Sequence, residues 1–139
     1  MPSKLSRKTQ PRNILIANLA TSLILHGKVR TTLPKAKLVQ SYVEKIFTDV
    51  KRNNLSSKRN IGAKLKDKLA VAKLFEIAQR NIAKLPASGN VSIYKLNFRK
   101  GDGATIALVK INDEVFKVTE EKVEKKSKTI TEEATKDHE

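Results

Sequence analysis

Apolar residues recur every three to four positions through residues 34–51. A strand cannot accommodate this period, whereas an amphipathic helix requires it. The apolar face of such a helix carries Val39, Tyr42, Val43, Ile46, Phe47 and Val50. Pro34 suits the first helical turn, because the N–H that proline lacks has no partner there. The segment therefore predicts a helix with one buried face. Glu44 lies on its polar face among cations, and we expect it to form a salt bridge.

A second helix is predicted just before this one, over residues 11–26. Leu15, Leu19 and Leu23 are spaced four apart and have apolar neighbours on both sides. This wide apolar stripe predicts that the helix is well buried. Gly27 follows it and can adopt the left-handed conformation that commonly ends a helix.

Two more helices are expected after the central one. Residues 58–65 predict a short helix that Ser56 or Ser57 caps, and residues 68–84 predict a longer helix that Asp67 caps. The inner stripe of the longer helix is expected to contain Val71, Leu74, Phe75, Ala78 and Ile82.

Strand patterns occur at three places. Residues 28–32 are rich in β-branched side chains, and residues 91–98 and 104–111 flank a loop, 99–103, that contains two glycines. The last two segments predict a hairpin. In its first strand, simple alternation puts three apolar side chains on one face: Tyr94, Leu96 and Phe98.

These elements predict an α+β fold. Three to four helices pack on a small sheet, which is formed by the C-terminal hairpin and a short strand between the first two helices. We expect a basic N-terminal arm at residues 1–12, one domain at 13–118 and a charged, disordered tail at 119–139, where apolar residues become scarce.

Charge divides the chain into two unequal parts. Residues 1–110 contain 23 Lys and Arg against 5 Asp and Glu, whereas residues 111–139 contain 6 against 9. A small domain this basic is typical of proteins that bind a polyanion, and nucleic acids are the abundant cellular polyanions. The alternative is an anionic membrane surface. The chain lacks Trp anchors and an apolar run of about 18 residues, so we expect neither surface insertion nor a membrane span.

The residue inventory argues against an enzyme. An enzyme needs acids, bases or nucleophiles that converge in a pocket, and residues 1–110 supply only five carboxylates, one His and no Cys. We therefore expect no catalytic residue, no metal, no cofactor and no small-molecule substrate. The six aromatic residues fall mostly at core spacing, which predicts no stacking platform for single-stranded RNA.

Four groups of cations are the candidate phosphate contacts. The arm contributes Lys4, Arg7, Lys8 and Arg12. The turn from the first strand into the central helix contributes Lys28, Arg30, Lys35 and Lys37. The short third helix and the segment after it contribute Lys58, Arg59, Lys64 and Lys66, with Lys68 nearby. The hairpin loop contributes Arg99 and Lys100.

Each group also has a reading without a ligand: a frayed terminus, a solvated helix face or an ordinary turn. The turn before the central helix is the hardest to explain in that way, because a helix N-terminus there adds unpaired N–H groups to the side-chain charge. Around the axis of the third helix, only two or three cations are expected to face RNA.

Three stretches resemble the L-seventeen family of bacterial large-subunit ribosomal proteins. They are NLATSLILHGKVRTTLPKAK at 18–37, DK at 67–68 followed by VAKLF at 71–75, and KLNFRKGD at 95–102. The resemblance covers about residues 4 to 111. It departs from the family at Pro11, where members usually have His, and at residues 88–92, where SGNVS replaces a Gly-Gly-Tyr-Thr-Arg pattern. Contacts of that Tyr and Arg are therefore not carried over.

The resemblance implies a structural constituent of the large ribosomal subunit. It implies large-subunit rRNA near the exit-tunnel side and neighbouring ribosomal proteins as partners, and a cytoplasmic or organellar ribosome as the location. The alternative is a general DNA-binding or nucleoid protein. A helix-turn-helix DNA-binding motif, however, needs two helices joined by three or four residues. The helices expected here are separated by a strand or by longer connecting segments.

Overall fold

The computed structural model describes residues 4–65, 67–81, 86 and 88–112, and within these ranges the chain is an α+β domain, as predicted. The helices are α1 (Thr9–His26), α2 (Leu33–Arg52), α3 (Leu55–Leu65) and α4 (Lys68–Asn81). The strands are β1 (Lys28–Thr32), β2 (Val91–Phe98) and β3 (Thr105–Ile111). They form one antiparallel sheet in the order β1-β3-β2. The expected tail and Ile82 lie outside the described residues.

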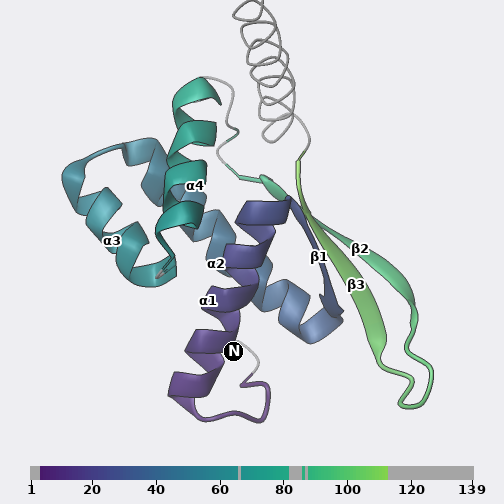
Figure 1. Ribbon diagram of the computed structural model, residues 1–139. Coiled ribbons are helices and arrows are strands. Elements are labelled where there is room, and N and C mark those ends of the chain that lie inside the picture. The colour runs from purple at the N-terminus through teal and green to yellow at the C-terminus, as the bar shows by residue number, and fades with distance from the viewer. Residues whose placement is uncertain (1–3, 66, 82–85, 87, 113–139) are drawn as a thin grey trace, which may run out of the picture.

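The molecule has three layers (Figure 1). The sheet packs on α1 and α2, and α3 and α4 pack on the other side of those two helices. Inward-facing sheet residues join the core with the apolar face of α2, and Phe47, Leu23 and Ile24 are among its largest fully buried side chains. The predicted burial of the first helix holds only for its second half, because Ile14 is 45% exposed.

Two helix starts differ from the prediction. α1 begins at Thr9, so the end of the expected arm is already helical. α3 begins at Leu55, because the Asn54 carboxamide accepts the N–H of Ser57 at 2.7 Å and caps the helix. Ser57 is buried and is not the cap. The link between α2 and α3 is consequently shorter than expected. The Asp67 cap of α4 is confirmed by its bond to the Leu69 N–H at 3.0 Å.

The beginning of β2 is tied to α2 by side chains rather than by the sheet alone. The Glu44 carboxylate accepts the N–H of Val91 at 2.9 Å and the Asn90 amide at 3.0 Å. Gln40 donates to the Val91 carbonyl at 2.8 Å. The Glu44 carboxylate was expected to form a salt bridge. Among the described residues it instead accepts hydrogen bonds from the Asn90 amide and the Val91 N–H.

The described helices include none that is both long enough and apolar enough to span a membrane.

Candidate nucleic-acid interface

The turn from α1 into β1 is held by two backbone hydrogen bonds of Gly27. Gly27 ends α1 in the left-handed conformation, with φ 73°, and its N–H donates to the Leu23 carbonyl at 2.8 Å. The Gly27 carbonyl accepts the N–H of Ile111 at 2.9 Å, which joins the end of α1 to the central strand. The chain therefore enters β1 directly, and Lys28 and Arg30 are both exposed on it.

The first turn of α2 offers unpaired backbone donors to an anion. Thr32 precedes the helix in an extended conformation, its side chain makes no capping bond, and the first turn contains no acidic residue. A helix N-terminus in this state carries partial positive charge. Lys37 is exposed and Lys35 is half-buried beside it. We call these four residues the corner cluster: Lys28, Arg30, Lys35 and Lys37.

The arm presents its cations in the same way. Lys4, Arg7 and Lys8 are exposed, and Arg12 is half-buried in the first turns of α1. Lys8 precedes α1 without a side-chain cap, so this second helix N-terminus also lacks a side chain that satisfies its first N–H groups.

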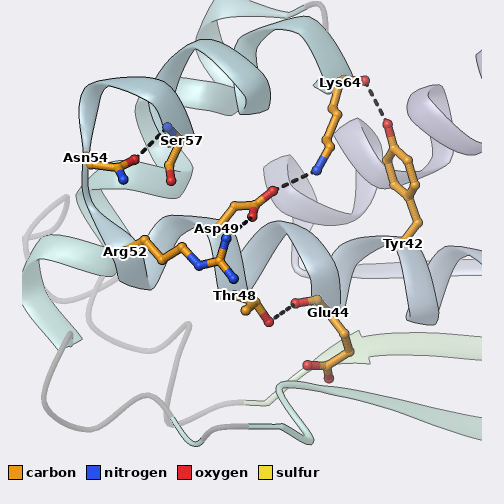
Figure 2. Close-up of polar contacts among 8 residues, drawn as sticks. All are labelled: Tyr42, Glu44, Thr48, Asp49, Arg52, Asn54, Ser57 and Lys64. Carbon is orange, nitrogen blue, oxygen red and sulfur yellow. Dashed lines mark hydrogen bonds and ion pairs between the residues drawn. The ribbon is translucent and has the colours of Figure 1, made fainter.

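The cations of α3 do not all face outward. Lys64 reaches back to α2 and pairs with Asp49 at 2.7 Å, as Figure 2 shows, and its backbone carbonyl accepts the Tyr42 hydroxyl at 3.0 Å. Lys58 and Arg59 are exposed, with the Lys58 ammonium 5.6 Å from the centre of the Phe75 ring. The prediction for Lys66 falls outside the described residues.

At the hairpin tip, one of the two predicted cations is already neutralised. Arg99 pairs with Asp102 through two hydrogen bonds. This bonding, with a further bond from the Ala104 N–H, lowers the pKa of the Asp102 carboxyl well below its ordinary range. The hydrogen bonds with Asp102 in turn raise the pKa of the Arg99 guanidinium. Lys100 is exposed, so it is the cation that the tip presents to a ligand.

The five carboxylates of the described residues all interact within the chain. Glu44 holds β2, Asp49 holds Lys64, and Asp67 caps α4. Asp102 pairs with Arg99, and Glu76 also has an interaction within the chain. The negative charge of the domain is therefore committed to its own structure. None of the corner-cluster cations pairs with a carboxylate in the described part of the chain.

Three of the four predicted sites have a part at one end of the molecule. The arm, the first turn of α2 and the hairpin tip lie at the same end of the molecule, the lower end in Figure 1. The α3 cations lie on another side, with the outer helical layer.

Aromatic residues on β2 were misplaced by the prediction. Phe47 on α2 is buried, but Tyr94 is 52% exposed and Phe98 is 73% exposed, so neither belongs to the core. Core spacing was the reason to expect no stacking platform for RNA, and it does not hold for these two rings. The two also lie on different faces. Tyr94 pairs with Leu108, and after a register shift between Lys95 and Phe98, Phe98 pairs with Thr105. Leu108 and Thr105 are three residues apart on β3 and therefore point to opposite faces of the sheet. The shared face expected for Tyr94 and Phe98 is wrong.

The described residues offer little to catalysis. A hollow of about 390 Å³ between α1, α2 and α3 is lined by amides, aliphatic side chains, Tyr42 and Lys64. It lacks a nucleophile–base pair, and the Tyr42 hydroxyl is already bonded. Within the described ranges, three or more His, Cys, Asp or Glu residues nowhere gather in a metal-binding group.

Fold and surface together define a class: a small, basic α+β protein with surfaces suited to a polyanion. A model of the family described as Ribosomal protein L17 matches residues 15–112, which contain the corner cluster, α3 and the hairpin.

Relatives named large ribosomal subunit protein bL17 align with most of the chain. The protein of Rickettsia bellii (strain OSU 85-389) is 41% identical over 110 residues, which are 79% of this chain and 77% of the relative. That of Thermomicrobium roseum is 42% identical over 76% of this chain and 90% of its own. The protein of Sulfurihydrogenibium sp. (strain YO3AOP1) is 49% identical over 105 residues, which are 74% of this chain and 85% of the relative. The chain belongs to the ribosomal protein L17 family.

Proposed function

We propose that the protein is a structural constituent of the large ribosomal subunit that binds and stabilises large-subunit rRNA in the cytoplasmic ribosome. The supporting observation is the corner cluster, in which Lys35 and Lys37 lie at an uncapped helix N-terminus and Lys28 and Arg30 lie on the strand that leads into it, all inside the family match. The family resemblance further implies a position near the exit-tunnel side, beside neighbouring ribosomal proteins. The relatives' names place those proteins in the large subunit.

Binding of this kind acts through phosphate neutralisation. Lysine and arginine side chains displace condensed counterions from RNA, and backbone N–H groups at the start of α2 add oriented donors. Such contacts fix the position of the protein on RNA without reading its bases. The arm and the tip of the β2–β3 hairpin lie at the same end of the molecule as the first turn of α2, which would allow one RNA segment to meet all three.

The test replaces all four corner-cluster residues with Gln and measures affinity for a large-subunit rRNA fragment across a salt series. The fold should be retained, because none of the four is in the buried core. The salt slope should fall by roughly one per lost phosphate contact. Circular dichroism is the folding control. An unchanged slope in a folded variant would contradict the proposal for this cluster.

A charge-matched pair sharpens the comparison. Lys37→Gln removes the same charge as Lys45→Gln, and Lys45 is exposed on the same helix beyond its first turn. Only Lys37→Gln should lower the slope. Duplex DNA of the same length serves as competitor, and equal affinity for DNA and RNA would favour the general DNA-binding alternative.

A further inference from the structure

The face of the sheet that points away from the helices combines cations with an exposed aromatic ring. Opposed residues of antiparallel strands share a face. Val29 and Val109 pair on the core side, so their neighbours along the strands point outward. We define the outer sheet face by two cross-strand rows: Lys28, Lys110 and Ser92 in the first, and Arg30, Leu108 and Tyr94 in the second.

The described helices leave this face of the sheet uncovered. The helices pack against the opposite side of the sheet, as Figure 1 shows. Tyr94 is 52% exposed and Arg30 is exposed, while half-buried Leu108 lies between them as an apolar floor. None of the six residues that define the face is acidic.

The charge pattern favours an anionic occupant. Lys28 and Arg30 are exposed cations in adjacent rows, and Arg30 lies across Leu108 from the Tyr94 ring. Two like charges this close repel each other, and an anion bound between them would relieve that repulsion. An occupant that carries both negative charge and a flat apolar surface matches all of these groups at once.

We infer that the outer sheet face binds an unpaired segment of RNA, with a base stacked on Tyr94 and the adjoining phosphates at Arg30 and Lys28. This inference rests on the proposed function, since it names the kind of RNA that one surface takes. Bases inside a duplex are stacked on each other and present no free face, whereas splayed bases of loops stack on aromatic rings. Duplex phosphates would be served by the corner cluster without Tyr94.

The test compares a short single-stranded oligo-adenylate with a blunt RNA duplex of the same length, using the full chain. Tyr94→Thr removes the ring and keeps a residue that favours strands. It should weaken oligo-adenylate binding about 5- to 100-fold, the range expected for one stacked base. It should leave duplex affinity and its salt slope unchanged. Tyr94→Phe, which keeps the ring, should bind the oligo-adenylate as the unaltered protein does.

Phe98→Thr is the matched control. It removes an exposed aromatic residue from the same strand but from the other face, so oligo-adenylate affinity should not change. Urea unfolding of each variant verifies that the sheet is intact.

The outcomes separate the inference from the function. If the unaltered protein binds neither RNA, the proposed function fails. If it binds both RNAs and Tyr94→Thr does too, with unchanged affinities, the inference is overturned and the function stands. An equal loss in Tyr94→Thr and Phe98→Thr also overturns it. The inference is also overturned if Tyr94→Thr binds RNA normally but is poorly incorporated into large subunits. That result would show that a protein, rather than RNA, covers the face.

Discussion

Glu44 shows how a single acidic residue is used in a basic chain. Its carboxylate bridges α2 and the start of β2 by accepting two N–H groups, from Asn90 and Val91. Asn90 is only 1% exposed, so its amide depends on partners within the protein. Hydrogen bonds to a charged group are stronger than neutral ones. Glu44 therefore stabilises the contact between a helix and a strand that lie far apart in the sequence.

Glu44→Ala should lower the free energy of unfolding by about 2 kcal/mol, because it removes charge-assisted bonds and leaves buried donors unsatisfied. Urea denaturation is the measurement. Thr48→Ala is the control: Thr48 is exposed and bonds only the Glu44 carbonyl one turn earlier, so its loss should change stability by less than about 0.5 kcal/mol. Equal denaturation midpoints for the two variants would show that the bridge contributes nothing.

Interactions between near neighbours were predictable from the sequence, and distant ones were not. The Asp67 cap was predicted because its bond spans two residues. The hydrogen bonds that Glu44 accepts from Asn90 and Val91 span 46 and 47 residues, and no local sequence pattern predicts them. The pairing of Lys64 with Asp49 was missed for the same reason, so a cation chosen as a phosphate contact proved to hold α3 against α2 (Figure 2).

At the scale of elements, the helical and two-residue periods located each helix and strand, but packing decided their ends and faces. In α3, buried Ser57, Ile61 and Leu65 form one row four residues apart. That row turns Ser57 into the core and moves the cap to Asn54. In β2, alternation identified the strand but did not show which face the helices cover. The register shift before Phe98 could not be predicted from the alternation of residues in the strand.

The capping assignment for α3 is directly testable. Asn54→Ala should destabilise the protein by about 1 kcal/mol, because the Ser57 N–H loses its acceptor. Ser56, one of the two caps proposed from sequence, is exposed, and Ser56→Ala should cost less than about 0.5 kcal/mol. Thermal unfolding followed by circular dichroism compares them. A larger loss for Ser56→Ala than for Asn54→Ala would reverse the assignment.

For the whole molecule, net charge links stability to binding. The chain carries a formal charge of +15, and the described carboxylates are committed to internal contacts. Repulsion among the remaining cations opposes the compact state. A polyanion that bound the folded surface would relieve that repulsion and would also stabilise the fold through mass action. The excess of positive charge can be read from composition, whereas the placement of Lys28 and Arg30 on the outer face of the sheet required the strand register.

Salt should therefore act in opposite directions on the free protein and on its complex. Raising the salt from about 0.1 M to about 1 M shortens the screening length from about 10 Å to about 3 Å. The melting temperature of the free protein should rise as cation repulsion is screened. Affinity for rRNA should fall, by about 10³- to 10⁵-fold between 50 and 200 mM salt if six to ten phosphates are contacted. Calorimetry and a filter-binding series measure the two effects. A melting temperature that falls with salt, or an affinity that does not, would mean that the cations are balanced within the protein rather than held for RNA.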